Sequence, residues 1–102
     1  EAEVKIKELN EKLAEKDYRS ASIYEKMEYN RAAIQYYTQV TEIYHDTKFA
    51  PMALHKKILL ENKRAQYTAV LKDIQDFLSR YPDDDRAEEL VELQEFLVAE
   101  GW

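Results

Sequence analysis

Apolar side chains recur at spacings of three and four along almost the whole chain, which is the period of amphipathic helices. Short polar breaks divide the pattern into five stretches, at about residues 2–27, 31–44, 50–61, 64–80 and 85–99. With 1 Gly and 2 Pro in 102 residues, the chain holds few of the residues that form tight turns between strands. The sequence therefore predicts an all-α fold of five helices.

The breaks carry signals for helix ends. Asp46 or Thr47 can cap the third helix, and Pro51 suits the first turn of that helix because its missing N–H costs nothing there. The run 81–85 (Tyr-Pro-Asp-Asp-Asp) is the clearest boundary, and its acids are expected to cap the last helix. Gly101 follows that helix as a C-terminal cap would.

Two segments of the chain repeat one another at a distance of about 37 residues. Residues 40–46 (Val-Thr-Glu-Ile-Tyr-His-Asp) align with residues 77–83 (Phe-Leu-Ser-Arg-Tyr-Pro-Asp), and upstream in the same register Ile34 aligns with Leu71. A fixed period in the thirties is typical of stacked helical hairpins. We therefore expect a tetratricopeptide-like, right-handed helical-hairpin solenoid with about two repeats and a terminal helix.

This organisation predicts a single domain over residues 1–102. Its first hairpin covers 1–47, its second hairpin covers 48–82 and its terminal helix covers 83–102. Because about three repeats are usually needed to bury a continuous core, we expect the chain to be the C-terminal part of a longer one. The small residues Ala21, Ala33 and Ala53 are expected where helices approach closely.

The net charge of −6 is unevenly distributed along the chain. Residues 83–102 hold eight acids against Arg86, a sum of −7, so the other 82 residues sum to +1. The clearest basic cluster comprises Lys56, Lys57, Lys63 and Arg64, which we interpret as a surface that steers an acidic protein partner. So small a cluster beside an acidic segment argues against nucleic acid as a partner.

Eight tyrosines are many for a chain of this length. Tyr24, Tyr37, Tyr44 and Tyr81 are expected as core residues or as wedges between the helices of a hairpin, with their hydroxyls reaching the edge to find a partner. Tyr36 cannot share the face of Tyr37, and Tyr29 lies at a predicted turn. We therefore predict that Tyr29 and Tyr36 are exposed anchors for a protein partner, because such aromatics are enriched at binding hot spots.

No residue pattern in the chain supports catalysis or a cofactor. His45 and Asp46 could act as a base and its orienting carboxylate, but no nucleophilic Cys or Gly-rich oxyanion loop accompanies them. His55 has Leu59 four residues later where a metal site would place a second ligand, and the Asp run lacks the alternation of a calcium loop. The sequence predicts a non-enzyme without metal or cofactor.

The residues also carry a family likeness. Residues 12–17 (Lys-Leu-Ala-Glu-Lys-Asp), 32–34 (Ala-Ala-Ile) and 44–54 (Tyr-His-Asp-Thr-Lys-Phe-Ala-Pro-Met-Ala-Leu) resemble phrases of the BamD lipoprotein family, also called YfiO or ComL. The resemblance runs from about Leu9 to Tyr81 and corresponds to the last two of that family's five repeats. His45 departs from the family's pattern, which has Pro there.

The resemblance implies a component of the machinery that assembles β-barrel proteins in the outer membrane, placed on the periplasmic face of that membrane. In the BamD family the C-terminal repeats dock on the periplasmic domains of BamA, beside other subunits of the machinery. The membrane would be reached only through an N-terminal lipid anchor that this stretch of chain does not contain. The apolar flank of the first helix (Ile6, Leu9, Leu13) could also pair with a neighbouring copy.

Two other readings of the likeness stay open. The Tol-Pal-associated CpoB (YbgF) proteins share the Tyr-Pro-Asp-Ser and Ala-Pro-x-Ala-Leu phrases but not the Lys-Leu-Ala-Glu-Lys phrase, so this family ranks second. A general tetratricopeptide adaptor would instead hold a partner peptide in its groove. The first helix offers Ser22, Glu25 and Lys26 there, which does not resemble the Asn and Lys set that clamps a peptide carboxylate.

Overall fold

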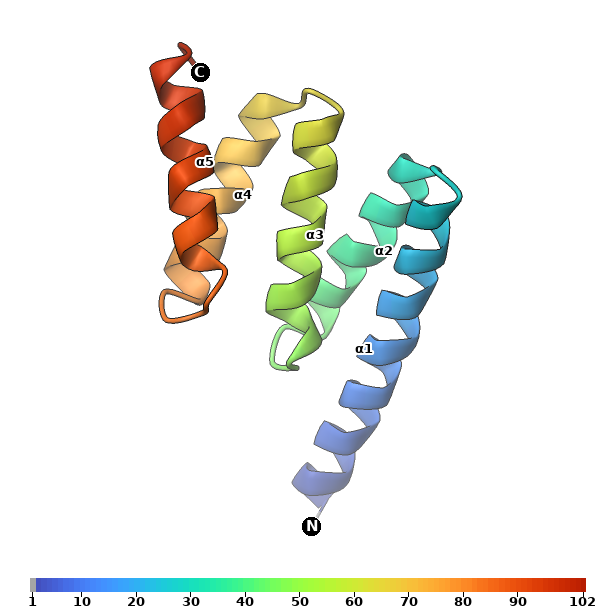
Figure 1. Ribbon diagram of the computed structural model, residues 1–102. Coiled ribbons are helices and arrows are strands. Elements are labelled where there is room, and N and C mark those ends of the chain that lie inside the picture. The colour runs from blue at the N-terminus through green and yellow to red at the C-terminus, as the bar shows by residue number, and fades with distance from the viewer. Residues whose placement is uncertain (1) are drawn as a thin grey trace. The chain divides into compact units, whose positions relative to one another are not determined.

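The stretches with apolar periodicity form helices in the computed structural model, which describes residues 2–102. The five helices are α1 (Ala2–Lys26), α2 (Asn30–Ile43), α3 (Phe49–Lys63), α4 (Tyr67–Arg80) and α5 (Ala87–Ala99) (Figure 1). No strand occurs within the described residues. The predicted all-α class of helical repeats is confirmed, and α4 begins three residues later than predicted because α3 continues to Lys63.

The chain forms two compact units that divide inside α3. The first unit runs to Lys57 and the second from Ile58 to Trp102. In the first unit α1 and α2 lie antiparallel, and the N-terminal turns of α1 extend past the end of α2 (Figure 1). In the second unit α4 and α5 lie antiparallel. The three-part organisation at 1–47, 48–82 and 83–102 stays a prediction.

Each unit has a core built from the predicted apolar positions. In the first unit the fully buried side chains include Ala14, Ala21, Ala33, Tyr37 and Val40. In the second they include Ile58, Val70, Ile74, Phe77 and Leu90. Ala21, Ala33 and Ala53 are fully buried, and their place at close helix crossings stays a prediction.

Three helices end in the same hydrogen-bonded turn, whose central residue has a positive φ. After α5 the N–H of Trp102 donates to the Leu97 carbonyl and the N–H of Gly101 to the Val98 carbonyl, with φ 99° at Gly101. This is the Schellman arrangement, and it confirms Gly101 as the C-terminal cap. The same pair of bonds closes α1 around Glu28 and α3 around Ala65, where φ is 62° and 59°.

The two matching phrases of the sequence adopt like conformations. The residues that precede α2 and α4, Tyr29 and Gln66, have φ/ψ of −86°/67° and −91°/65°. At the other end of each helix, the carbonyls of Tyr44 and Tyr81 accept the N–H groups of Thr47 and Asp84 at 3.1 and 3.2 Å. The internal repeat therefore describes backbone structure as well as residue type.

The predicted caps of α3 and α5 form differently from expectation. The Thr47 hydroxyl donates to the Tyr44 carbonyl at 2.7 Å and so stabilises the turn before α3. The N-cap of α5 is Arg86, without a side-chain capping bond, so the prediction that the Asp run supplies this cap was wrong. Asp84 instead accepts the backbone N–H of Arg86 at 2.9 Å and pairs with its guanidinium at 3.0 Å.

Candidate protein-binding surface

An interior aromatic group holds the first hairpin together. The ring of Tyr18 meets Tyr37 edge-on at 5.4 Å and lies 5.8 Å from Phe49. The buried Tyr37 hydroxyl donates to the Glu25 carboxylate at 2.7 Å and lies 3.3 Å from the Ser22 hydroxyl. Burial raises the pKa of Tyr37 well above its ordinary value; the Glu25 carboxylate adds to the rise and the Ser22 hydrogen bond opposes it.

A second aromatic group lies toward the surface at the turn between α1 and α2. We call Tyr24, Tyr29 and Tyr36 the turn cluster. Tyr24 and Tyr36 stack with ring centroids 5.4 Å apart and planes 14° apart, and Tyr29 lies 6.4 Å from Tyr24. Tyr29 is exposed, as predicted. Tyr36 was also predicted to be exposed, but it is half-buried because one face of its ring stacks on Tyr24.

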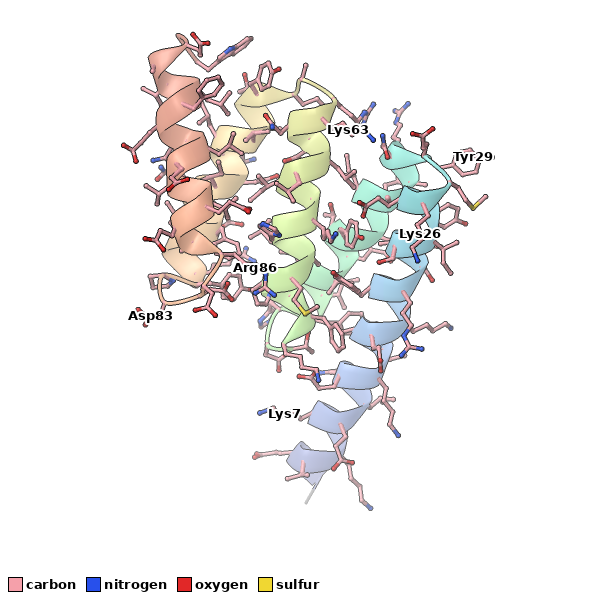
Figure 2. All side chains as sticks on the ribbon, viewed as in Figure 1. Lys7, Lys26, Tyr29, Lys63, Asp83 and Arg86 are labelled. Atoms are coloured by element: carbon pink, nitrogen blue, oxygen red, sulfur yellow. The ribbon has the colours of Figure 1, made fainter. Side chains whose placement is uncertain are left out.

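The turn cluster is bordered by further exposed apolar side chains. Ile23 and Met27, which lie on α1 and just after it, are more than half exposed. Lys26 and Tyr29 lie at this same turn (Figure 2). Aromatic and Met side chains together are enriched at protein interfaces, and the stacked pair already holds two of the rings in place. The exposure of Ile23 and Met27 was not predicted, because apolar side chains at spacings of three and four are usually buried.

The predicted basic cluster is divided between the two units. Lys56 and Lys57 are half-buried near the end of the first unit. Lys63 and Arg64 are exposed at the end of α3 in the second unit, and Figure 2 shows Lys63 at that end. The long stems of half-buried lysines can cover apolar surface while their ammonium groups reach water. Lys63 and Arg64 are therefore the more accessible pair.

The predicted acid–base and metal candidates are two histidines in different elements. His45 is exposed in the turn after α2, and His55 is half-buried on α3. Across residues 2–102, no three His, Asp or Glu side chains gather as the ligands of a metal ion would. Likewise, none of the helices in this range combines the length and apolar character needed to cross a membrane.

The second unit carries an aromatic pair of its own at the end of α5. The exposed Trp102 ring lies 5.1 Å from Tyr67, and the two residues line a surface hollow together with Leu93 and Phe96. The Schellman turn at Gly101 directs the chain back toward α4 and so positions this indole. The apolar pattern gives no signal for Trp102, because a residue that follows the end of a helix is outside its periodic stretch.

One comparison with known proteins identifies a family. Residues 1–65 match the family model described as "YfiO: Outer membrane lipoprotein". The matched range covers α1, α2 and α3 and ends at the left-handed residue Ala65. No curated protein matches the chain.

Proposed function

Because the chain belongs to the YfiO family of outer membrane lipoproteins, we propose that it is a non-catalytic scaffold that docks on another folded protein of the outer-membrane assembly machinery. By resemblance, the partner is the periplasmic part of a BamA-like protein. The working location is the periplasmic face of the outer membrane. The family match covers more than half of the chain and supports its assignment to the outer membrane lipoproteins. The identity of the partner is what we propose.

The observation that carries this proposal is the turn cluster. Its stacked pair, Tyr24 and Tyr36, is held between two packed helices, so little side-chain freedom is lost when a partner binds. Tyr29 and Met27 extend the apolar surface into solvent. A rigid aromatic centre with an exposed rim is the usual composition of a binding hot spot.

The basic side chains have a different role in the proposal. Exposed charges at the edge of an interface mainly accelerate encounter with an oppositely charged partner. Lys63 and Arg64 are exposed and Lys56 and Lys57 are half-buried, so we assign the four residues to steering and the tyrosines to affinity.

Titration calorimetry of the chain with a BamA periplasmic fragment tests the proposal. We expect a complex with the unaltered chain and a loss of about tenfold or more in affinity for Tyr29→Ala, which removes an exposed aromatic anchor. Ile43→Ala is the matched control, because Ile43 is equally exposed but lies at the opposite end of α2. Absence of any complex, or equal losses for both variants, would contradict the proposed surface.

Replacing Lys56, Lys57, Lys63 and Arg64 together by Glu tests the steering role. We expect a slower association rate, most clearly at low salt, with an unchanged dissociation rate and unchanged helicity. An unaltered association rate would remove these residues from the approach path.

A further inference from the structure

The turn cluster brings three phenol rings from successive parts of the chain to one place. Tyr24 lies near the end of α1, Tyr29 in the turn and Tyr36 on α2. The Schellman turn around Glu28 sets the first two, because the N–H of Tyr29 donates to the Tyr24 carbonyl at 2.9 Å. The antiparallel return of α2 then lays Tyr36 against Tyr24 (Figure 1).

Two of these rings are close and nearly parallel. The centroids of Tyr24 and Tyr36 are 5.4 Å apart with 14° between the ring planes, an offset stack in which carbons of the two rings are in van der Waals contact. The ring of Tyr29 lies 6.4 Å from that of Tyr24. All three residues belong to the first unit, so their arrangement follows from the packing of α1 on α2 within that unit.

The cluster is most open to solvent at Tyr29. This side chain is 56% exposed and extends outward from the turn (Figure 2), whereas Tyr24 and Tyr36 are half-buried. A one-electron oxidant in solution therefore meets Tyr29 first. Because the next ring is 6.4 Å away, Tyr24 can pass an electron to a phenoxyl radical on Tyr29, with the protons exchanged through water.

A second close pair of tyrosines in the first unit is held in a different way. Tyr37 is fully buried, its hydroxyl donates to Glu25 and lies beside the Ser22 hydroxyl, and Tyr18 meets its ring edge-on at 64°. A ring fixed at its hydroxyl end cannot turn to press the neighbouring ring carbon against a second ring. The half-buried stack of Tyr24 and Tyr36 borders solvent and has room for that movement.

We propose that the turn cluster is an oxidative cross-linking site, at which Tyr24 and Tyr36 couple to dityrosine. The co-reactant is a one-electron oxidant such as a peroxidase supplied with hydrogen peroxide, and Tyr29 is the entry point of the oxidising equivalents. This inference does not depend on the proposed partner or location.

The reaction balances in atoms and electrons. Tyr24 and Tyr36 each lose one electron and the proton of the hydroxyl, and a carbon–carbon bond forms between ring carbons next to the two oxygens. The hydrogen on each bonded carbon then moves to the oxygen through water and restores the phenol. One hydrogen peroxide accepts the two electrons and two protons and becomes two water molecules.

The bond joins α1 to α2 covalently across the hairpin turn. Like a disulfide, a cross-link that closes the loop from residue 24 to residue 36 reduces the conformational freedom of the unfolded chain. We therefore expect the coupled protein to melt about 5–10 °C above the uncoupled protein. Thermal melting followed by circular dichroism measures this difference.

Tryptic digestion makes the site of coupling readable. Lysine and arginine residues between the rings place each ring in a peptide of its own: Tyr24 in 20–26, Tyr29 in 27–31 and Tyr36 in 32–48. The dilute chain is treated with a haem peroxidase and limiting hydrogen peroxide, and the monomer is isolated and digested. We expect peptide 20–26 joined to peptide 32–48, with a mass two hydrogen atoms below their sum.

Three phenylalanine variants assign the residues. Tyr36→Phe keeps the ring but removes the phenol, so the joined peptides should disappear. Tyr44→Phe is the matched control, because Tyr44 is also half-buried and lies in the same peptide, and it should leave the yield unchanged. Tyr29→Phe should slow the coupling severalfold without moving its site. Circular dichroism verifies that each variant keeps its helicity.

Several results would overturn the proposal. One is an oxidised monomer without the joined peptides, so that dityrosine forms only between chains. Another is a Tyr36→Phe variant that retains the product, or a product in which peptide 17–19, which holds Tyr18, replaces peptide 20–26. An unchanged rate for Tyr29→Phe would contradict its entry role. A melting temperature that coupling leaves unchanged or lowers would show that the bond forms outside the native stack.

Discussion

Glu28 and Ala65 adopt the same left-handed backbone conformation, with φ of 62° and 59°, at equivalent positions of the repeat. Each is the central residue of a Schellman turn, in which glycine is the usual occupant because it has no Cβ to clash with the backbone. A residue with a side chain pays roughly 1–2 kcal/mol in this region. The turn is therefore specified by the hydrogen bonds of the helix end rather than by a local glycine.

Substituting glycine at either position should stabilise the protein. We expect Glu28→Gly and Ala65→Gly each to raise the free energy of unfolding by about 0.5–1 kcal/mol, the relief of left-handed strain less the backbone entropy of glycine. Urea denaturation measures the change. Gln39→Gly, at an exposed site within α2, is the control and should lower stability by about 1 kcal/mol. Destabilisation at position 28 or 65 would contradict this account of the turns.

The reverse change at the end of α5 should be unfavourable. Gly101 has φ 99°, and nothing lies within 4 Å of where a Cβ would stand, so the cost of Gly101→Ala is one of backbone conformation alone. We expect a loss of about 1–2 kcal/mol in unfolding free energy. A neutral result would show that the turn rearranges around the new side chain, which altered Trp102 fluorescence would reveal.

The buried Tyr37 predicts a loss of stability at alkaline pH. A tyrosine ionises near pH 10 in an unfolded chain, whereas burial keeps Tyr37 protonated in the folded state. Above about pH 10 the unfolded state therefore binds fewer protons, and the free energy of unfolding falls by up to about 1.4 kcal/mol per pH unit. Below that pH this contribution is fully present.

The Tyr37→Phe variant separates this effect from general alkaline damage. It loses the hydrogen bond to Glu25 and should be about 1 kcal/mol less stable at neutral pH. Its stability should then fall less steeply above pH 10 than that of the unaltered chain. Urea titrations at neutral and alkaline pH measure both slopes, and equal slopes would mean that Tyr37 ionises normally in the folded state.

The complete burial of Ala33 predicts that the first hairpin has no room for a larger side chain at this position. The residue is fully buried on α2, so Ala33→Trp must displace packed neighbours and should destabilise the protein by about 1–3 kcal/mol or more. Gln35→Trp, at an exposed position of the same helix, adds the same ring without that penalty. Thermal melting followed by circular dichroism compares them, and equal melting temperatures would place Ala33 outside the core.

The helices and their repeat were predictable because each depends on local signals. Apolar spacing located all five helices, and the recurring aromatic-x-Asp phrase fixed the period. The left-handed residues were not predictable, since neither Glu28 nor Ala65 is a residue type that favours that conformation. The N-cap at Arg86 was not predicted, because Asp is a better capping residue than Arg, but Asp84 lies three residues before the first residue of α5.

The candidate binding surface was predictable only in part. Tyr29 was identified by its place at a turn and Tyr36 by its face of the helix. Both signals can be read from a single segment of the sequence. The stack of Tyr36 on Tyr24 joins two helices, so it depends on how α1 and α2 cross and leaves no trace in either segment alone. The basic cluster looked continuous in sequence because its residues are neighbours there, whereas the units divide between Lys57 and Ile58.

Trp102, the only indole in the chain, gives the second unit a fluorescent reporter that the first unit lacks. Its emission reports local polarity beside Tyr67, whereas six of the eight tyrosines lie in the first unit. Indole fluorescence therefore follows the unfolding of the second unit, while far-ultraviolet ellipticity follows the helices of both units. Equal melting temperatures from the two signals indicate that the units melt together, and different temperatures indicate that they melt in steps. No attached dye is needed for this comparison.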